Sequence, residues 1–313
     1  MSKKRGPLTP LRHAFEYGLF QLISALVRPL HPLTLDRWAR KLGSLLNSIP
    51  GKRKQIARIN IDLAFGDSKT HNEKEAILER STQNLVAAAL QCLWLQSDTQ
   101  YRAKQLLEED PKGLDALKKC LDRGKGVFFL SAHFGNWEFM AINHGYMGLG
   151  KLHPIVRRLD NPLLESVTEK LRTASGNELF YREDPPLRIV RALKNNHCVG
   201  VMMDQNTAKG GVFVDFFGRK AATARSVALL SYKIGAAILP LFSYPTGRGT
   251  WRIEYGPEIH LEKTGDKEAD LLTWTQACES FIEEKVRLHP ECWMWAHRRW
   301  KTRPPEEGGA KIY

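Results

Sequence analysis

The segment GVFFLSAHFGNWE, residues 126–138, carries the most informative pattern in the chain. Its apolar run VFFL predicts a buried strand, and the small residues that follow predict a turn that presents His133. Gly135 permits a tight backbone, and Asn136 is placed to cap a helix that carries Glu138. Open α/β sheets bind their ligands at the carboxyl ends of strands, so His133 is a candidate catalytic residue.

His133 and Glu138 are the first candidate pair of functional side chains. Five positions separate them, whereas residues on one helical face are three or four apart. Across a turn from loop to helix, however, the carboxylate of Glu138 can reach the imidazole, fix its tautomer and raise its basicity. No serine or cysteine nucleophile adjoins them, so the pair predicts a general base that activates a hydroxyl of the substrate. A capped helix beside a surface histidine would give the same local pattern.

The part of the chain after residue 124 predicts an α/β fold with a mixed, mostly parallel sheet flanked by helices. Short apolar runs alternate there with amphipathic helical stretches, which is typical of strands joined by crossover helices. The expected strands are residues 126–130, 152–156, 178–181, 198–203, 212–216, 237–243 and 250–255. The expected helices are residues 136–146, 162–174, 187–195, 223–234 and 267–288.

The first third of the chain predicts helices only, with starts near residues 9, 34, 56 and 72. We therefore expect four parts in the chain. These are a membrane-associating apolar helix (1–32), a helical region packed on the core (33–123), the α/β core (124–304) and a loose tail (305–313).

The N-terminal apolar helix suits a membrane surface. Its uncharged run YGLFQLISALV, residues 17–27, is shorter than the roughly 20 residues that cross a bilayer, and no small-residue cleavage site follows it. We expect it to lie in the interface, and a marginal span with snorkelling flanks is the alternative. Lys3, Lys4, Arg5 and Arg12 favour the anionic cytoplasmic leaflet.

Composition narrows the classes of partner. The chain has 313 residues, 47 Lys and Arg against 34 Asp and Glu, and a formal net charge of +13. Such an excess favours an anionic partner, and nucleic acid, anionic lipid or an acidic protein would each fit. The five cysteines form no C-x-x-C pair, which indicates a reducing compartment, and the histidines show no familiar zinc spacing. We predict no metal site and no cofactor.

The segment SAHFGNWE resembles the H-x4-D/E motif of the lysophospholipid acyltransferase superfamily, in the wording of its bacterial lipid A biosynthesis branch, the lauroyl and myristoyl transferases. Further blocks resemble that branch in the same order. They are RINIDLAFG (58–66), VRRLDNPLL (156–164), MMDQN (202–206), GGVFVDFFGRKAAT (210–223) and WMWAHRRWKTRP (293–304). Arg158, Asp215 and Lys220 stand where the family usually has proline.

The resemblance implies that His133 and Glu138 are catalytic, and that the residues of the other blocks bind substrate. Arg157 matches the family arginine and would contact a phosphate or the developing oxyanion, unless it only pairs with Asp160. Asp204 ends a strand and would orient an arginine or a substrate hydroxyl, or else cap the next loop.

The later blocks supply the remaining candidates. Gly210, Gly211 and Phe213 would wall an acyl pocket, although such aromatic residues are often plain strand core. Thr223 and Arg225 would open a helix whose free amides hold a phosphate. Arg298 and Arg299, interleaved with tryptophans, would form a headgroup interface. The same mixture can stack single-stranded nucleic acid, but no RNA-binding signature accompanies it, and we expect no nucleic-acid partner.

The expected function is therefore acyl transfer at the cytoplasmic face of the cell inner membrane. By resemblance the donor is an acyl-acyl carrier protein, with acyl-CoA as the alternative, and the acceptor is a hydroxyl of a lipid A precursor, an anionic glycolipid. Another glycolipid or phospholipid acceptor, and a thioesterase using the same His–Glu pair, remain open. A binding protein without catalysis is the third class.

Overall fold

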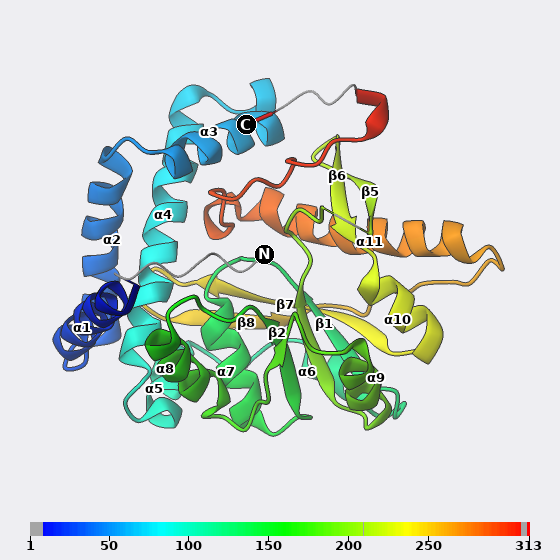
Figure 1. Ribbon diagram of the computed structural model, residues 1–313, viewed down its shortest axis with the longest axis horizontal. Helices are drawn as coiled ribbons and strands as arrows, with labels where there is room; N and C mark the ends of the chain where they lie inside the picture. The colour runs from blue at the N-terminus through cyan, green and yellow to red at the C-terminus, as the bar shows by residue number, and fades with distance from the viewer. Residues whose placement is uncertain (1–8, 209, 308–311) are drawn as a thin grey trace.

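The computed structural model describes residues 9–208, 210–307 and 312–313 and is built around a six-stranded sheet (Figure 1). The strand order is β3-β2-β4-β1-β7-β8; β8 is antiparallel to β7, and the other neighbours are parallel. The predicted mixed, mostly parallel sheet is confirmed. The strands are β1 Val127–Ser131, β2 Leu152–Val156, β3 Phe180–Tyr181, β4 Cys198–Met202, β7 Ala237–Pro245 and β8 Trp251–Tyr255.

Helices cover both faces of the sheet, which explains why β1 is a continuous apolar run rather than an alternating one. Phe128 belongs to the core cluster that includes Ile282 of α11, whereas Phe129 belongs to the opposite cluster with Phe139 of α7. The helices of this part are α6 Leu114–Leu121, α7 Trp137–Met147, α8 Pro162–Thr173, α9 Pro186–Lys194, α10 Ser226–Ile234 and α11 Lys267–Leu288.

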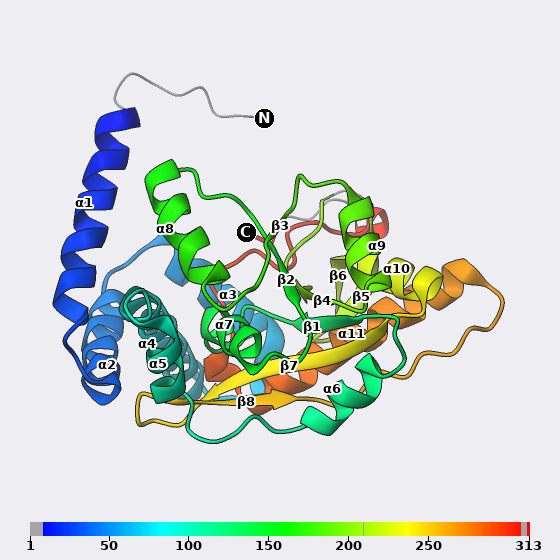
Figure 2. The ribbon, with the colours of Figure 1, turned by 90° about the horizontal axis from the view of Figure 1, so that it is seen from below.

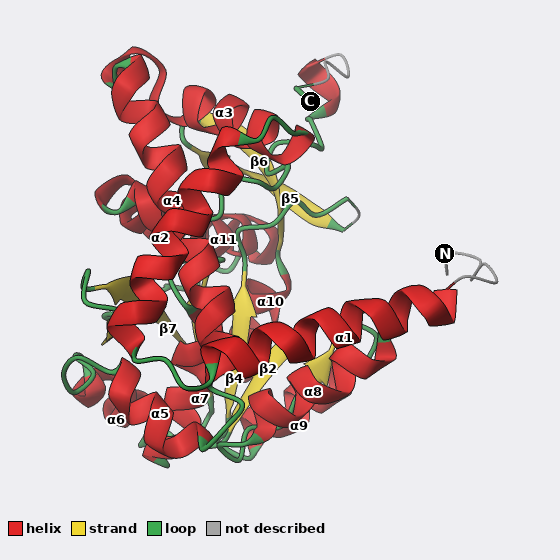
Figure 3. Ribbon diagram, turned by 90° about the vertical axis from the view of Figure 1, so that its left-hand side faces the viewer, coloured by secondary structure: helices red, strands yellow, loops and turns green. Residues whose placement is uncertain are grey.

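The first third of the chain is helical, as the sequence predicts, and its helices stand beside the sheet (Figures 1 and 3). α2 and α4 pack closely because Gly43 lies at their crossing, where an added Cβ would come within 2.7 Å of the Cα of Gln83. The helices are α1 Thr9–Val27, α2 Pro32–Ser48, α3 Lys52–Phe65, α4 His71–Trp94 and α5 Thr99–Leu106, with a 3-10 turn at Gly66–Ser68 after α3. α5 and α6 fall within the predicted helical region 33–123, although neither was predicted as a separate helix.

A two-stranded hairpin, β5 Gly211–Phe216 and β6 Arg219–Ala224, replaces the predicted helix start at Thr223. Phe217 and Gly218 form its turn with φ of 54° and 68°, the left-handed pair that a two-residue hairpin turn requires. The hairpin packs on α11, where Gln276 hydrogen bonds the backbone N–H and C=O of Asp215 at 2.7 and 2.9 Å. α10 therefore begins only at Ser226.

α1 projects from the body and lies along α8 (Figures 2 and 3). Asn161 at the start of α8 donates to the backbone oxygen of His13 and to Glu16, at 3.0 and 2.9 Å. None of the helices in the described part of the chain has both the length and the apolar character needed to cross a bilayer. The predicted basic residues Lys3, Lys4 and Arg5 lie outside the described residues.

The C-terminal segment returns to the body. Two 3-10 turns, Pro290–Cys292 and Pro305–Glu307, follow α11. The hydroxyl of Tyr313 donates to Asn60 at 2.5 Å and accepts the backbone N–H of Trp300 at 3.2 Å. The last residue is thus held on α3, which differs from the loose tail expected there.

Candidate active site

His133 lies in the loop between β1 and α7, at the carboxyl end of the central strand. Gly135 has a φ of +59°, and a Cβ there would sit 2.1 Å from the backbone oxygen of Ser243, so this loop packs directly on β7. Asn136 caps α7 by accepting the backbone N–H of Phe139 at 3.1 Å. The predicted roles of Gly135 and Asn136 are confirmed, and they fix the direction in which His133 leaves the sheet.

The partner of His133 is Asp204. Nδ1 of the imidazole lies 2.9 Å from Oδ1 of Asp204, and the backbone N–H of His133 donates to Oδ2, also at 2.9 Å. Burial lowers the pKa of His133, but the charge and hydrogen bond of Asp204 outweigh burial and leave that pKa raised above its ordinary value. Because Asp204 is fully buried and accepts from Nδ1–H, the other nitrogen, Nε2, is left as the basic atom.

Sheet topology brings His133 and Asp204 together. β1 and β4 are parallel neighbours, and Ser131 at the end of β1 pairs with Met202 at the end of β4. Each functional residue lies two positions beyond its strand, so both emerge at the same edge of the sheet. The sequence predicted both residues at strand ends. It predicted that Asp204 orients an arginine or a substrate hydroxyl, not that it binds His133.

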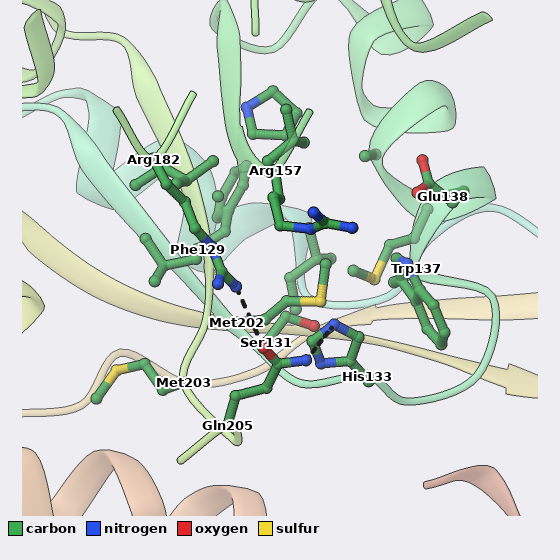
Figure 4. Close-up of a pocket in the computed structure, with 18 of the residues that line it drawn as sticks. Phe129, Ser131, His133, Trp137, Glu138, Arg157, Arg182, Met202, Met203 and Gln205 are labelled. Atoms are coloured by element: carbon green, nitrogen blue, oxygen red, sulfur yellow. Dashed lines mark hydrogen bonds between the residues drawn. The ribbon is translucent and has the colours of Figure 1, made fainter. Parts of the chain in front are cut away.

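Glu138 does not hold His133, and the predicted contact is wrong. Its carboxylate instead forms a bidentate ion pair with Arg172 in the last turn of α8. Nε of Arg172 donates to Oε2 of Glu138 at 2.8 Å, and Nη2 of Arg172 donates to Oε1 in a second, shorter contact. Glu138 lies in the first turn of α7, which packs against α8, and its side chain therefore meets the guanidinium rather than the imidazole. Figure 4 shows Glu138 and His133 on the wall of the same cavity.

The C-terminal segment fixes Asp204 from behind. Trp293 donates its indole N–H to Oδ2 at 2.9 Å, and Nε2 of His297 lies 2.8 Å from the backbone oxygen of Asp204. Burial alone would raise the pKa of Asp204, but the charge and hydrogen bonds of His133 hold it well below its usual range. The carboxylate is thus ionised and rigid. The sequence singled out the block 293–304, which contains Trp293 and His297, but it did not predict that these residues hold Asp204.

A cavity of about 640 Å³ opens beside Nε2 (Figure 4). Its polar wall is formed by His133, Glu138, Arg157, Arg172, Arg182 and Gln205. Its apolar wall lies between the sheet and α7 and is formed by Phe129, Met140, Ala141, Ile142, Leu152, Ile155, Gly200, Val201, Met202 and Leu241. A polar end beside a base and a long apolar end suit a substrate that carries a hydrocarbon chain.

Arg157 follows β2 and lines this cavity, as predicted for a substrate-binding residue. Its guanidinium extends toward the middle of the cavity in Figure 4, and it also pairs with Asp160 at 3.1 Å. Both side chains are more than half exposed, so this pair is weakly held and leaves Arg157 free to meet an anionic group.

The remaining predicted substrate-binding residues lie outside the cavity lining formed by the described residues. Gly210, Gly211 and Phe213 are on or beside the exposed end of the β5–β6 hairpin rather than in an acyl pocket. Thr223 is fully buried in β6, and Arg225 pairs with Glu268 at 2.5 Å at the start of α10.

Arg299 is a core residue, and the interface predicted around it is wrong. Its guanidinium is fully buried, pairs with Glu279 at 3.0 Å and donates to Thr223 at 2.6 Å. Arg298 beside it is exposed and lies over the ring of Tyr313. The tryptophans expected at the interface, Trp293, Trp295 and Trp300, are each at most 1% exposed, so they can contact neither headgroups nor nucleic-acid bases.

This arrangement has the geometry that general-base catalysis requires. An ionised carboxylate orients the imidazole, and Nε2 faces a cavity with arginines on its wall. Within the described residues, no group of three or more His, Cys, Asp or Glu side chains is placed to hold a metal ion.

Comparisons with known proteins identify the family of this chain. The family model described as bacterial lipid A biosynthesis acyltransferase matches residues 9–302. The lipid A biosynthesis palmitoleoyltransferase of Escherichia coli is 28% identical over 281 residues, covering 87% of this chain and 86% of the relative. The lipid A biosynthesis lauroyltransferase of E. coli is 25% identical over 272 residues, 84% of each chain. The phosphatidylinositol mannoside acyltransferase of Mycobacterium tuberculosis is 29% identical over 204 residues, 64% of this chain and 62% of the relative. The chain belongs to the bacterial lipid A biosynthesis acyltransferase family and is an acyltransferase.

Proposed function

We propose that this acyltransferase moves a fatty acyl chain from an acyl-acyl carrier protein to a hydroxyl of a lipid A precursor. The family match and the activities for which the E. coli relatives are named support the acceptor class. The observation that carries the mechanism is the Asp204–His133 pair, whose Nε2 faces a cavity with one polar and one apolar end.

In the proposed reaction, Nε2 of His133 takes the proton of the acceptor hydroxyl. The oxygen attacks the thioester carbonyl, and the developing oxyanion is stabilised by Arg157 and by backbone N–H groups, at roughly 3–4 kcal/mol for each good donor. The C–S bond then breaks, and the thiolate takes the proton from His133. Because the acceptor oxygen attacks directly, the products are the ester and the free thiol, and no acyl-enzyme forms.

The division of the cavity assigns a place to each part of the substrates. The acyl chain would lie along the apolar wall between the sheet and α7, where each buried methylene contributes about 0.8 kcal/mol. The anionic groups of the acceptor would meet Arg157 and Arg182 at the polar end. Glu138 would fix Arg172 in the wall between the two ends.

We further propose that α1 docks on the cytoplasmic face of the inner membrane. Leu11, Phe15 and Leu22 are 70%, 73% and 59% exposed, and Leu19 and Leu26 extend the same row at helical spacing. A row of large apolar side chains that projects from the body fits a helix lying in the headgroup region, and a single N-terminal anchor is the alternative.

An acidic carrier protein fits the net charge of +13, which would speed its encounter with the enzyme. Acyl-CoA is the alternative donor. The two are separated by offering each thioester at equal concentration and comparing kcat/KM, with carrier protein expected to be preferred and the preference expected to fall as salt rises.

The direct test incubates purified enzyme with a panel of acyl-carrier-protein thioesters and a lipid A precursor, and reads product masses. His133→Ala should abolish transfer, whereas His260→Ala, an exposed loop histidine, should leave it unchanged. If the His133→Ala protein keeps the wild-type rate, His133 is not the base.

A second acceptor class has its own support in the mycobacterial relative, which is a phosphatidylinositol mannoside acyltransferase. The same assay with that glycolipid as acceptor distinguishes the two classes by kcat/KM. Acyl release without any acceptor at the rate of transfer would instead indicate a thioesterase.

A further inference from the structure

His133 and Gln205 both line the cavity, and in this structure the basic atom of His133 is engaged by the side chain of Gln205. The amide nitrogen of Gln205 lies 3.2 Å from Nε2 of His133, and its amide oxygen accepts from Nη2 of Arg182, also at 3.2 Å (Figure 4). The three side chains come from the ends of three different strands, β1, β4 and β3.

Hydrogen-bond chemistry fixes the direction of this chain of contacts. Asp204 accepts the proton on Nδ1, which leaves Nε2 with a lone pair and no hydrogen. The amide NH2 of Gln205 can therefore donate to Nε2, while its oxygen faces a guanidinium that only donates. A flipped amide would set NH2 against Arg182 and oxygen against a lone pair, so neither end tolerates the reversal.

We propose that Gln205, held by Arg182, is a latch that occupies the base until the acceptor lipid arrives. Nε2 has one lone pair, and a water molecule or a hydroxyl must use it to lose a proton. Water that displaces Gln205 gains only one hydrogen bond in exchange for the one it breaks. An acceptor lipid brings the binding energy of its whole body, and that energy drives the displacement.

The position of Arg182 explains how the acceptor opens the latch. Arg182 is exposed and lines the cavity, so an anionic group of the acceptor can draw its guanidinium away from Gln205. The released amide can then leave Nε2. The latch thus favours transfer, thioester plus alcohol giving ester plus thiol, over hydrolysis, thioester plus water giving carboxylic acid plus thiol.

The inference rests on the proposed function and is tested apart from it. Lauroyl-acyl carrier protein is incubated with the full-length enzyme, first without acceptor and then with a lipid A precursor, and thiol release and ester formation are measured. Gln205→Ala and Arg182→Met should each raise hydrolysis without acceptor about fivefold, which is about 1 kcal/mol for one hydrogen bond at 1.4 kcal/mol per tenfold.

Two controls separate a latch from a general disturbance of the site. Arg191→Met removes an exposed arginine of α9 outside the cavity lining and should leave both rates at the wild-type value. His133→Ala combined with Gln205→Ala should abolish the extra hydrolysis, because that hydrolysis uses Nε2. A merely structural Gln205 would lower both rates on substitution instead of raising one.

The outcomes are distinct. Unchanged or reduced hydrolysis in both Gln205→Ala and Arg182→Met, in an enzyme that still transfers acyl chains, overturns the latch and leaves the acyltransferase mechanism in place. Absence of transfer in the wild-type enzyme overturns the proposed acceptor. Since Arg182 is exposed, its variant folds normally and keeps the test decisive if Gln205→Ala does not fold.

Discussion

Replacement of Asp204 by asparagine is expected to remove nearly all acyl transfer while keeping the fold. Oδ2 of Asp204 accepts two donors, the backbone N–H of His133 and the indole N–H of Trp293, both at 2.9 Å. In the variant the amide oxygen must take that place, which turns the amide NH2 toward Nδ1. The imidazole must then accept at Nδ1 and carry its proton on Nε2, where it cannot act as a base.

The geometry also sets the size of the effect. When His133 takes a proton, its charge lies 2.9 Å from Oδ1 of Asp204, and that attraction is worth about 6 kcal/mol at an effective dielectric constant of about 20. A loss of this size is about 10⁴-fold in rate, close to the effect of the equivalent Asp-to-Asn change in Ser-His-Asp triads. The loss should appear in kcat rather than KM, because Asp204 is buried behind His133 and meets no substrate.

The assay compares initial rates of ester formation for wild type, Asp204→Asn and Asp67→Asn, a surface control on the turn after α3. Thermal unfolding of all three proteins checks that the variant is folded. A folded Asp204→Asn enzyme that retains more than a tenth of the wild-type kcat would refute the assignment of Asp204 as the partner of the base.

Three further predictions follow from the same structure. His133 must be neutral to act, and its pKa is raised above the ordinary value for histidine. In a pH–rate profile, log kcat/KM should therefore fall as the pH decreases through that raised pKa. Arg299→Met leaves a buried carboxylate without its partner and should destabilise the fold by about 3–5 kcal/mol in urea unfolding, whereas Arg298→Met beside it should change stability by less than about 0.5 kcal/mol. Gly200 lines the cavity, and a Cβ there makes only ordinary contacts of 3.5 Å or more, so Gly200→Leu should fold and shorten the preferred acyl chain. A shift of about two methylenes, about 1.6 kcal/mol or 15-fold in relative kcat/KM, is expected across a series of chain lengths; an unchanged preference would place the chain elsewhere.

Local patterns were sufficient for most of the fold. The helix at 267–288 and the strand at 152–156 match their predicted bounds, because periodicity and flanking signals mark them without reference to the rest of the chain. The first strand of the hairpin, at 212–216, was predicted, but its partner at 219–224 was missed because the turn Phe217-Gly218 lacks the Asn-Gly or Asp-Gly signature.

The site itself was half predictable. His133 could be found because the turn after a buried strand is a local signal. Its partner could not, since the contact with Asp204 depends on which strand lies beside β1, and that order is a property of the whole sheet. Sequence proximity favoured Glu138 instead, but the packing of α7 on α8 gives that carboxylate to Arg172. Similarly, the tryptophans near the C-terminus gave no local sign that they would be buried.

Because Trp293 and His297 hold Asp204 in place, the site can be completed only late in synthesis of the chain. During translation His133 is added first and Asp204 follows, but Trp293 and His297, which hydrogen bond Asp204, are added about 90 residues later. Until those two residues are present, Asp204 lacks the hydrogen bonds that position it beside His133. Catalytic competence therefore depends on the last part of the chain to be synthesised, and a polypeptide that ends before Trp293 should lack activity.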